Sequence, residues 1–186
     1  MDLVLFGIQG SGKGTQAKAL AQKYNFVIFE TGAECRRLAT ENSELGKKVK
    51  EIVDAGNLVP AHIVIQILEN FLSKLPPTQK VIFDGIPRNQ EQHIEFDKLI
   101  ARLGRDFLAV NITLPQEETI KRLLVRGRHD DLPEVITNRI KIFIRDTSPI
   151  IEDYRSQNKI FDINGNQPIE DVSKEIFSKF DQYFLK

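Results

Sequence analysis

Residues 1–23, MDLVLFGIQGSGKGTQAKALAQK, constrain the fold of this chain more than any other stretch. Leu3 to Phe6 form a short, continuous apolar run, which is typical of a strand buried on both faces of a parallel sheet. A helical pattern begins near Lys13. The loop between them is rich in glycine, so its backbone N–H groups can turn toward an anion at the positive end of the helix. The stretch therefore predicts a strand, a phosphate-binding loop and a helix.

The loop departs from the general phosphate-binding pattern G-x-x-x-x-G-K-[ST] at one position. The pattern holds through Lys13, but Gly14 stands where Ser or Thr is expected, and the hydroxyl follows at Thr15. A glycine-rich turn without a ligand is the alternative interpretation. The strand before the loop, the lysine within it and the helix after it all favour phosphate binding.

Composition narrows the classes of protein that remain. The length of 186 residues fits one domain with a substantial core. Lys plus Arg equals Asp plus Glu at 26 each, so we expect no general basic surface for nucleic acid. No apolar run reaches the length of a membrane span. Cys35 is the only cysteine, which excludes an intramolecular disulfide and a multi-cysteine zinc site and fits a reducing cytoplasm.

Short apolar runs alternate with helical patterns along the whole chain. The predicted strands cover residues 3–6, 26–29, 81–83, 108–114 and 159–163. A long helix is predicted from residue 132 through 144 and as far as 154. The alternation predicts one α/β domain over residues 1–186, an open five-stranded parallel sheet of the P-loop NTPase type with helices on both faces. Ligands are expected at the carboxyl ends of the strands, beside Gly7, Glu30 and Asp84.

Five motifs then appear in a fixed order: GIQGSGKGTQ, TG followed by Arg36, GNLVP, DGIPRNQEQ, and RGRHDD with Arg139 downstream. In this order and at this spacing they resemble the adenylate kinases, and more closely their short forms, which are nucleoside monophosphate kinases. The resemblance covers essentially the whole chain. It implies reversible transfer of a phosphoryl group from ATP to AMP, giving two ADP. It also suggests that the peptide bond before Pro87 is cis.

The resemblance implies a role for individual residues. Those placed on ATP are Gly10, Ser11, Gly12, Lys13, Gly14, Thr15 and Arg122. Those placed on AMP are Thr31, Gly32, Arg36, Leu58, Val59, Gly85, Arg88 and Gln92. The catalytic set is Lys13, Asp84, Arg88, Arg126, Arg128 and Arg139. Asp84 is expected to organise the cofactor Mg²⁺ through bound water.

Cations suit this chemistry because phosphoryl transfer spreads negative charge over the transferred oxygens, so catalysis depends on positioning and electrostatic stabilisation. Guanidinium groups match phosphate oxygens better than ammonium groups do. Asp130 and Asp131 are expected to orient the neighbouring arginines, although a solvated acidic pair fits the sequence nearly as well. Two further classes of function remain as alternatives: a UMP/CMP kinase and a non-catalytic nucleotide-binding regulator. A GTPase switch is less favoured, because the chain lacks the N-K-x-D motif.

Thr31 and Gln92 favour AMP over CMP and UMP. In the resemblance, Thr31 lies beside the acceptor adenine and the Gln92 amide faces its Watson–Crick edge, and an unpaired buried amide would reject the wrong base. Glu30 and Glu34 depart from the family pattern and add negative charge near the acceptor, which predicts weaker AMP binding.

The lid is shorter than in most members of the family. A helical insertion over about residues 30–60 is expected to bind the acceptor, and a stub lid over about 126–132 is expected to deliver the arginines. Such a short lid predicts poorer exclusion of water from the transferred phosphoryl group. A monomer acting on ATP, AMP and ADP, without nucleic acid or membrane partners, is the overall expectation.

Overall fold

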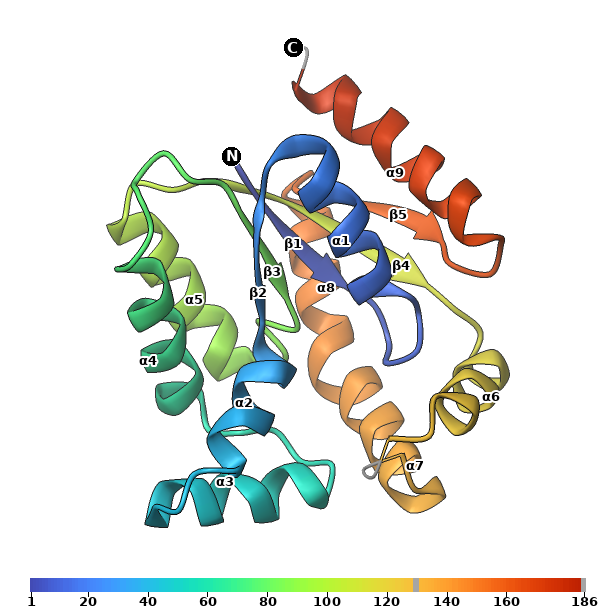
Figure 1. Cartoon of the computed structure of the whole chain (residues 1–186). Coiled ribbons are helices and arrows are strands. Elements are labelled where there is room, and N and C mark those ends of the chain that lie inside the picture. Colours follow the sequence, from blue (N-terminus) through green and yellow to red (C-terminus); the bar gives the residue numbers. More distant parts are fainter. Residues whose placement is uncertain (129–130, 185–186) are drawn as a thin grey trace.

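The computed structural model describes residues 1–128 and 131–184. Its centre is a five-stranded parallel sheet with the order β2-β3-β1-β4-β5 (Figure 1). The strands are β1 (Asp2–Phe6), β2 (Val27–Glu30), β3 (Val81–Asp84), β4 (Phe107–Thr113) and β5 (Ile160–Asn164). The predicted open parallel sheet is confirmed, and the predicted strands lie within about one residue of these bounds. The chain order reverses beside β1, which places the glycine-rich loop at the switch point of the sheet.

Helices cover both faces of the sheet, as predicted. On one face, α1 (Lys13–Tyr24) and α9 (Ile169–Phe184) enclose a core that includes Leu20 and Ile176. On the other face, α4 (Ala61–Leu72), α5 (Gln90–Arg102) and α8 (Ser148–Ser156) enclose a second core that includes Leu68, Phe96 and Tyr154. The central strands β1 and β3 are buried on both faces, which explains their continuous apolar sequence.

The remaining helices lie beyond the carboxyl ends of the strands (Figure 1). They are α2 (Thr31–Ala39), α3 (Glu44–Asp54), α6 (Gln116–Arg126) and α7 (Pro133–Ile142). Ser43 caps α3 and Asn89 caps α5, each accepting a hydrogen bond from the backbone N–H three residues on. Within the described residues, no helix has both the length and the apolar character that a membrane span requires.

The long helix predicted from residue 132 is not one regular α-helix. Between α7 and α8 the chain forms a π-helical segment, η1 (Phe143–Thr147), and helical structure then continues to Ser156. Such segments occur often at functional sites. Here the Thr147 hydroxyl donates a hydrogen bond of 2.8 Å to the carbonyl of Arg88, so the segment contacts the loop after β3. The peptide bond between Ile86 and Pro87 in that loop is cis, as the resemblance suggested.

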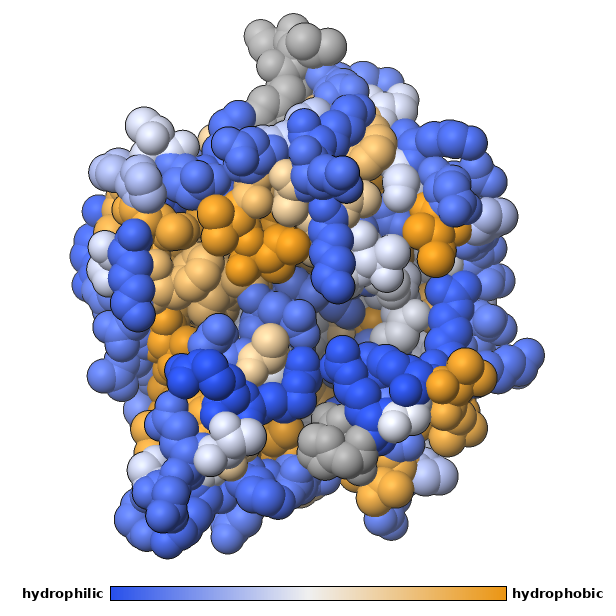
Figure 2. Space-filling model, viewed as in Figure 1, coloured by the Kyte–Doolittle hydropathy of each residue, from blue (hydrophilic) through white to orange (hydrophobic). Residues whose placement is uncertain are grey.

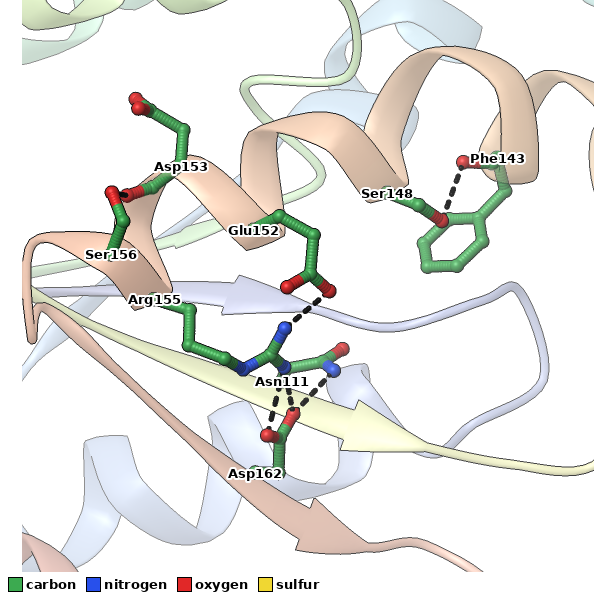
Figure 3. A network of polar contacts seen from close by, with 8 residues as sticks. All are labelled: Asn111, Phe143, Ser148, Glu152, Asp153, Arg155, Ser156 and Asp162. Carbon is green, nitrogen blue, oxygen red and sulfur yellow. Dashed lines mark hydrogen bonds and ion pairs between the residues drawn. The ribbon is translucent and has the colours of Figure 1, made fainter.

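A polar network attaches α8 to the edge of the sheet (Figure 3). Arg155 donates to both carboxylate oxygens of Asp162 on β5, at 2.9 and 2.8 Å. Asn111 on β4 donates to the same carboxylate at 2.7 Å, and Glu152 pairs with Arg155 from the α8 side. Asp162 therefore joins two strands and a helix through one carboxylate.

At the opposite end of the sheet, Asp2 forms a buried ion pair. Its carboxylate lies 2.6 and 2.8 Å from two guanidinium nitrogens of Arg105 and also accepts the backbone N–H of Val81 at 2.9 Å. The carboxylate therefore connects β1, β3 and the turn before β4. Removing one partner of such a pair leaves a buried charge without compensation.

We predict that Asp2→Ala lowers the free energy of unfolding by about 3 kcal/mol, because it leaves the buried charge of Arg105 without its carboxylate partner. Urea unfolding of the variant measures this change. Glu69→Ala is the matched control, because it breaks only the exposed pair with Arg102. The control should change stability by less than about 1 kcal/mol. Equal losses in the two variants would contradict the prediction.

Candidate active site

A cleft of about 440 Å³ opens at the carboxyl ends of β1, β2 and β3. This volume is in the range of small-molecule sites. Its lining comes from the glycine-rich loop, the start of α2, the connection before α4, the end of β3, and α6 and α7. Figure 2 shows strongly hydrophilic residues gathered around a hollow in the middle of this face. Segments far apart in sequence therefore meet at one polar site.

The glycine-rich loop forms one wall of the cleft. Gly10 and Gly12 have positive φ values of 85° and 96°, and Gly12 stands directly before α1. The hydroxyl of Ser11 and the side-chain carbonyl of Gln9 are buried and lack hydrogen-bond partners among the described residues. Buried polar atoms without partners are uncommon in native proteins. They indicate that a polar ligand completes this loop.

Lys13 folds back over the loop. Its ammonium group donates to the carbonyls of Gly7 and Ile8, at 2.6 and 3.1 Å. Burial lowers the pKa of Lys13 to about 8, against the opposing effect of the Asp84 carboxylate. A phosphate group beside this amine would favour its charged form. In this structure the Lys13 ammonium group is therefore held by two neutral carbonyl groups, which a phosphate oxygen could replace.

Asp84 ends β3 and lies in register with Leu5 of β1 and Glu30 of β2. Burial raises the pKa of its carboxyl group, while Lys13 and Arg88 act in the opposite direction. A buried carboxylate that lines the cleft, as the hydroxyl-bearing Thr15 also does, fits Mg²⁺, which takes few protein ligands and keeps several waters. The residues present therefore suit the expected metal.

Arg88 also lines the cleft and is held by its own loop. Its Nε donates to the carbonyl of Gly85 at 2.8 Å, and a Cβ added to Gly85 would lie 2.4 Å from its Nη2. The backbone N–H of Arg88 donates to the side-chain carbonyl of Gln92 at 2.9 Å. The Gln92 amide donates in turn to the carbonyl of Val59 at 3.2 Å. One buried glutamine thus joins the Arg88 loop to the connection before α4.

The amide of Gln92 retains capacity for a ligand. A glutamine side chain offers two N–H donors and two carbonyl lone pairs, and one of each is used in these contacts. The Thr31 hydroxyl nearby is buried and lacks a hydrogen-bond partner among the described residues. Both polar groups lie on the lining of the cleft.

Four arginines close the cleft from the other side: Arg122 and Arg126 on α6, Arg128 in the connection after it, and Arg139 on α7. Asp131 organises this group. Its side chain is 0 % exposed and lies 2.8 and 2.6 Å from two nitrogens of Arg126. It also lies 3.5 Å from a guanidinium nitrogen of Arg139 and accepts the backbone N–H of Arg128. The short connection therefore brings its arginines to the same cleft as Lys13.

Comparison with known proteins agrees with this geometry. A sequence model of the family described as "Adenylate kinase" matches residues 5–159. "Adenylate kinase 1" of Synechocystis is 35% identical over 175 residues, 94% of each chain, and the adenylate kinase of Caulobacter strain K31 is 37% identical over 95% of this chain and 96% of its own. The adenylate kinase of Azobacteroides is 34% identical over 99% of both.

The chain belongs to the adenylate kinase family. The prediction made from the motifs is therefore confirmed, and with it the activity of a phosphotransferase that converts ATP and AMP into two ADP. The comparisons do not favour the UMP/CMP kinase or the non-catalytic regulator.

Nearly all of the predicted site residues line the cleft. The two exceptions lie directly behind it: Ser11 is buried within the loop, and Gly85 lines a small adjoining cavity of about 30 Å³. Arg126 ends α6, so the predicted stub lid begins inside a helix and its loop starts at Gly127. The expectation for Asp130 falls outside the described residues.

The sequence leaves one contributor open and gives no sign of another. It predicts that Asp131 orients the arginines but fits a solvated acid nearly as well, and the structure shows Asp131 as the buried acceptor for Arg126 and Arg139. Its place between Arg126 and Arg139 was the available signal. No local pattern in the sequence marks Thr147, whose hydroxyl reaches the Arg88 carbonyl across a sequence separation of 59 residues.

We predict that Asp131→Asn lowers kcat by about 10- to 100-fold with a smaller change in KM, because the arginines lose their common acceptor and their alignment. Steady-state kinetics measure the change, and thermal unfolding shows whether the variant is folded. Asp171→Asn is the control, since it breaks only an exposed pair with Lys174 on α9. A folded Asp131→Asn enzyme with wild-type kcat would contradict the positioning role.

Proposed function

We propose that the phosphoryl transfer takes place in this cleft, with the glycine-rich loop and Lys13 on the donor nucleotide and Arg36, Arg88 and Gln92 on the acceptor. The observation that carries the proposal is the ring of cations around one cleft. Lys13 and Arg88 line the cleft together with Asp84, whose charge they both influence, and four arginines from α6, α7 and their connection line the same cleft. A triphosphate donor and a monophosphate acceptor provide the negative charge that such a ring requires.

In this mechanism the protein supplies position and charge rather than a side-chain base. Lys13 binds the donor phosphates, and Arg88 orients the acceptor phosphate in line with them. Arg126 and Arg139, held by Asp131, stabilise the charge that spreads over the transferred group. Because these groups are fixed before the reaction, little reorganisation is needed as the charge moves.

Asp84 would hold Mg²⁺ through bound water, and Thr15 lines the same cleft. The metal supplies charge neutralisation between the donor phosphates when it is bound. Burial of the Asp84 carboxylate, which raises its pKa, supports this assignment because a cation beside it would relieve the unfavourable burial of charge.

We propose AMP as the preferred acceptor, bound in the helical insertion over about residues 30–60. The free donor and the free lone pair of Gln92 would pair with the adenine edge, and Leu58 and Val59 would provide an apolar wall. Gly32 and Thr31 border the same space. A pyrimidine would leave the buried amide unpaired.

The stub lid over about residues 126–132 would act by moving with α6 and α7, whose ends carry its arginines. We further propose that the enzyme works as a monomer in the cytoplasm. The single free, buried Cys35 fits the reducing cytoplasm.

The assignment of the donor site is tested by Lys13→Ala. ADP formation from ATP and AMP should fall by at least about 100-fold, since the loop lysine contacts the donor phosphates. Lys23→Ala is the control, because Lys23 lies at the far end of α1 and pairs with Asp181. Assays with and without AMP also measure hydrolysis of ATP under the short lid. Unaltered ADP formation in Lys13→Ala would refute the donor site.

The assignment of the acceptor is tested by comparing kcat/KM for AMP, CMP and UMP. AMP should be favoured by at least about 100-fold, because a site built to hydrogen-bond one base leaves its polar groups unpaired with another. A kcat/KM for CMP equal to or higher than that for AMP would refute this assignment without contradicting the kinase activity itself.

A further inference from the structure

Glu30 places a negative charge on the acceptor side of the cleft. It is the last residue of β2 and lines the cleft together with Arg36. Its Oε1 lies 3.0 Å from Nη2 of Arg36. Arg36 is the residue that the proposed function assigns to the phosphate of AMP. The Glu30 carboxylate therefore accepts a hydrogen bond from Arg36, whose guanidinium group is assigned to the substrate phosphate.

The Glu30 side chain does not cap α2, the helix that follows it. Glu30 stands at the N-cap position of this helix, where a side chain commonly accepts a backbone N–H, but it makes no capping hydrogen bond. Ser43 and Asn89 do cap their helices. The Glu30 carboxylate thus turns to Arg36 instead of stabilising its own helix.

The position of Glu30 also brings two carboxylates together. Glu30 and Asp84 are register partners at the ends of β2 and β3, and both influence the charge at Lys13. Asp84 is buried and suits a metal. Glu30 is the extra negative charge, and it lies where a monophosphate would approach. Like charges this close repel, and the repulsion is stronger than in bulk water.

The pair between Glu30 and Arg36 is exposed enough to break. The Glu30 side chain is 42 % exposed and that of Arg36 is 29 % exposed. Ion pairs at this exposure are weak, and salt screens them. A phosphate dianion can therefore displace the carboxylate, which weakens acceptor binding without preventing it.

We propose that Glu30 is an internal competitor for the acceptor phosphate, which pairs with Arg36 in the empty site and sets a lower affinity for AMP. The proposal rests on the proposed function through the role of Arg36. The opposite role is that Glu30 holds Arg36 in the orientation that AMP needs. The two roles predict opposite signs for the effect of removing the charge.

The experiment measures the dissociation constant for AMP by calorimetry in the wild type, Glu30→Gln and Glu30→Ser. Glutamine keeps a neutral hydrogen-bond acceptor for Arg36, whereas serine removes the contact. Competition predicts that Kd for AMP falls by about tenfold in both variants, the scale of one close charge interaction in a partly solvated site. Weaker or unchanged AMP binding in both variants would overturn the proposal.

Three controls separate this effect from a general change in the site. Glu34→Gln removes a carboxylate on the same helix that pairs with Arg37 outside the cleft, and it should leave Kd for AMP unchanged. Adenosine, which lacks the phosphate, should bind equally to the wild type and Glu30→Gln. The gain for AMP should shrink at high salt and disappear in an Arg36→Gln background. Equal tightening of adenosine would refute competition for the phosphate.

ADP formation is measured in the same samples. Its loss in the wild type would refute the proposed function, whereas unchanged AMP affinity in an active Glu30→Gln enzyme refutes only the role of Glu30.

Discussion

The site depends on positive charge held close to the carboxyl ends of β1 and β3. Burying Lys13 and Arg88 is unfavourable in itself, and both have lowered pKa values for that reason. The protein offsets this penalty by giving each cation an internal acceptor. Lys13 donates to the Gly7 carbonyl, Arg88 to the Gly85 carbonyl, and Arg126 to Asp131. The cations are thereby oriented before a nucleotide arrives.

These acceptors differ in how readily a phosphate replaces them. Backbone carbonyls are neutral, so a phosphate oxygen competes well for the lysine and for Arg88. The Asp131 side chain is fully buried and contacts both Arg126 and Arg139. A phosphate therefore does not displace Asp131 from these arginines, and the three residues move together. Glu30 lies between these cases, charged but partly exposed. The cleft thus contains three kinds of acceptor. A phosphate can displace the backbone carbonyls, it does not displace Asp131, and it competes with Glu30 for Arg36.

The scaffold joins the two halves of the cleft through the helical unit of α7, η1 and α8. Arg139 on α7 lines the cleft, while the Thr147 hydroxyl in η1 donates to the backbone carbonyl of Arg88. Asn138 on α7 also donates to the carbonyl of Ala55 and to Asn57, in the connection between α3 and α4. A movement of α7 would therefore be transmitted directly to the connection between α3 and α4, on the acceptor side of the cleft. Tyr154 and the Arg155 network fix the far end of this unit on the sheet.

The sequence by itself determined the sheet, the position of the phosphate loop and most of the lining of the cleft. Those features follow from local patterns: apolar runs for buried strands, glycines before Lys13, and polar residues such as Asp84 at strand ends. Only the tertiary structure decided that Asp131 is a buried acceptor rather than a solvated acid, that a π-helical segment brings Thr147 to Arg88, and that Glu30 pairs with Arg36. Burial and pairing depend on which segments pack together, and that information lies in contacts distant along the chain.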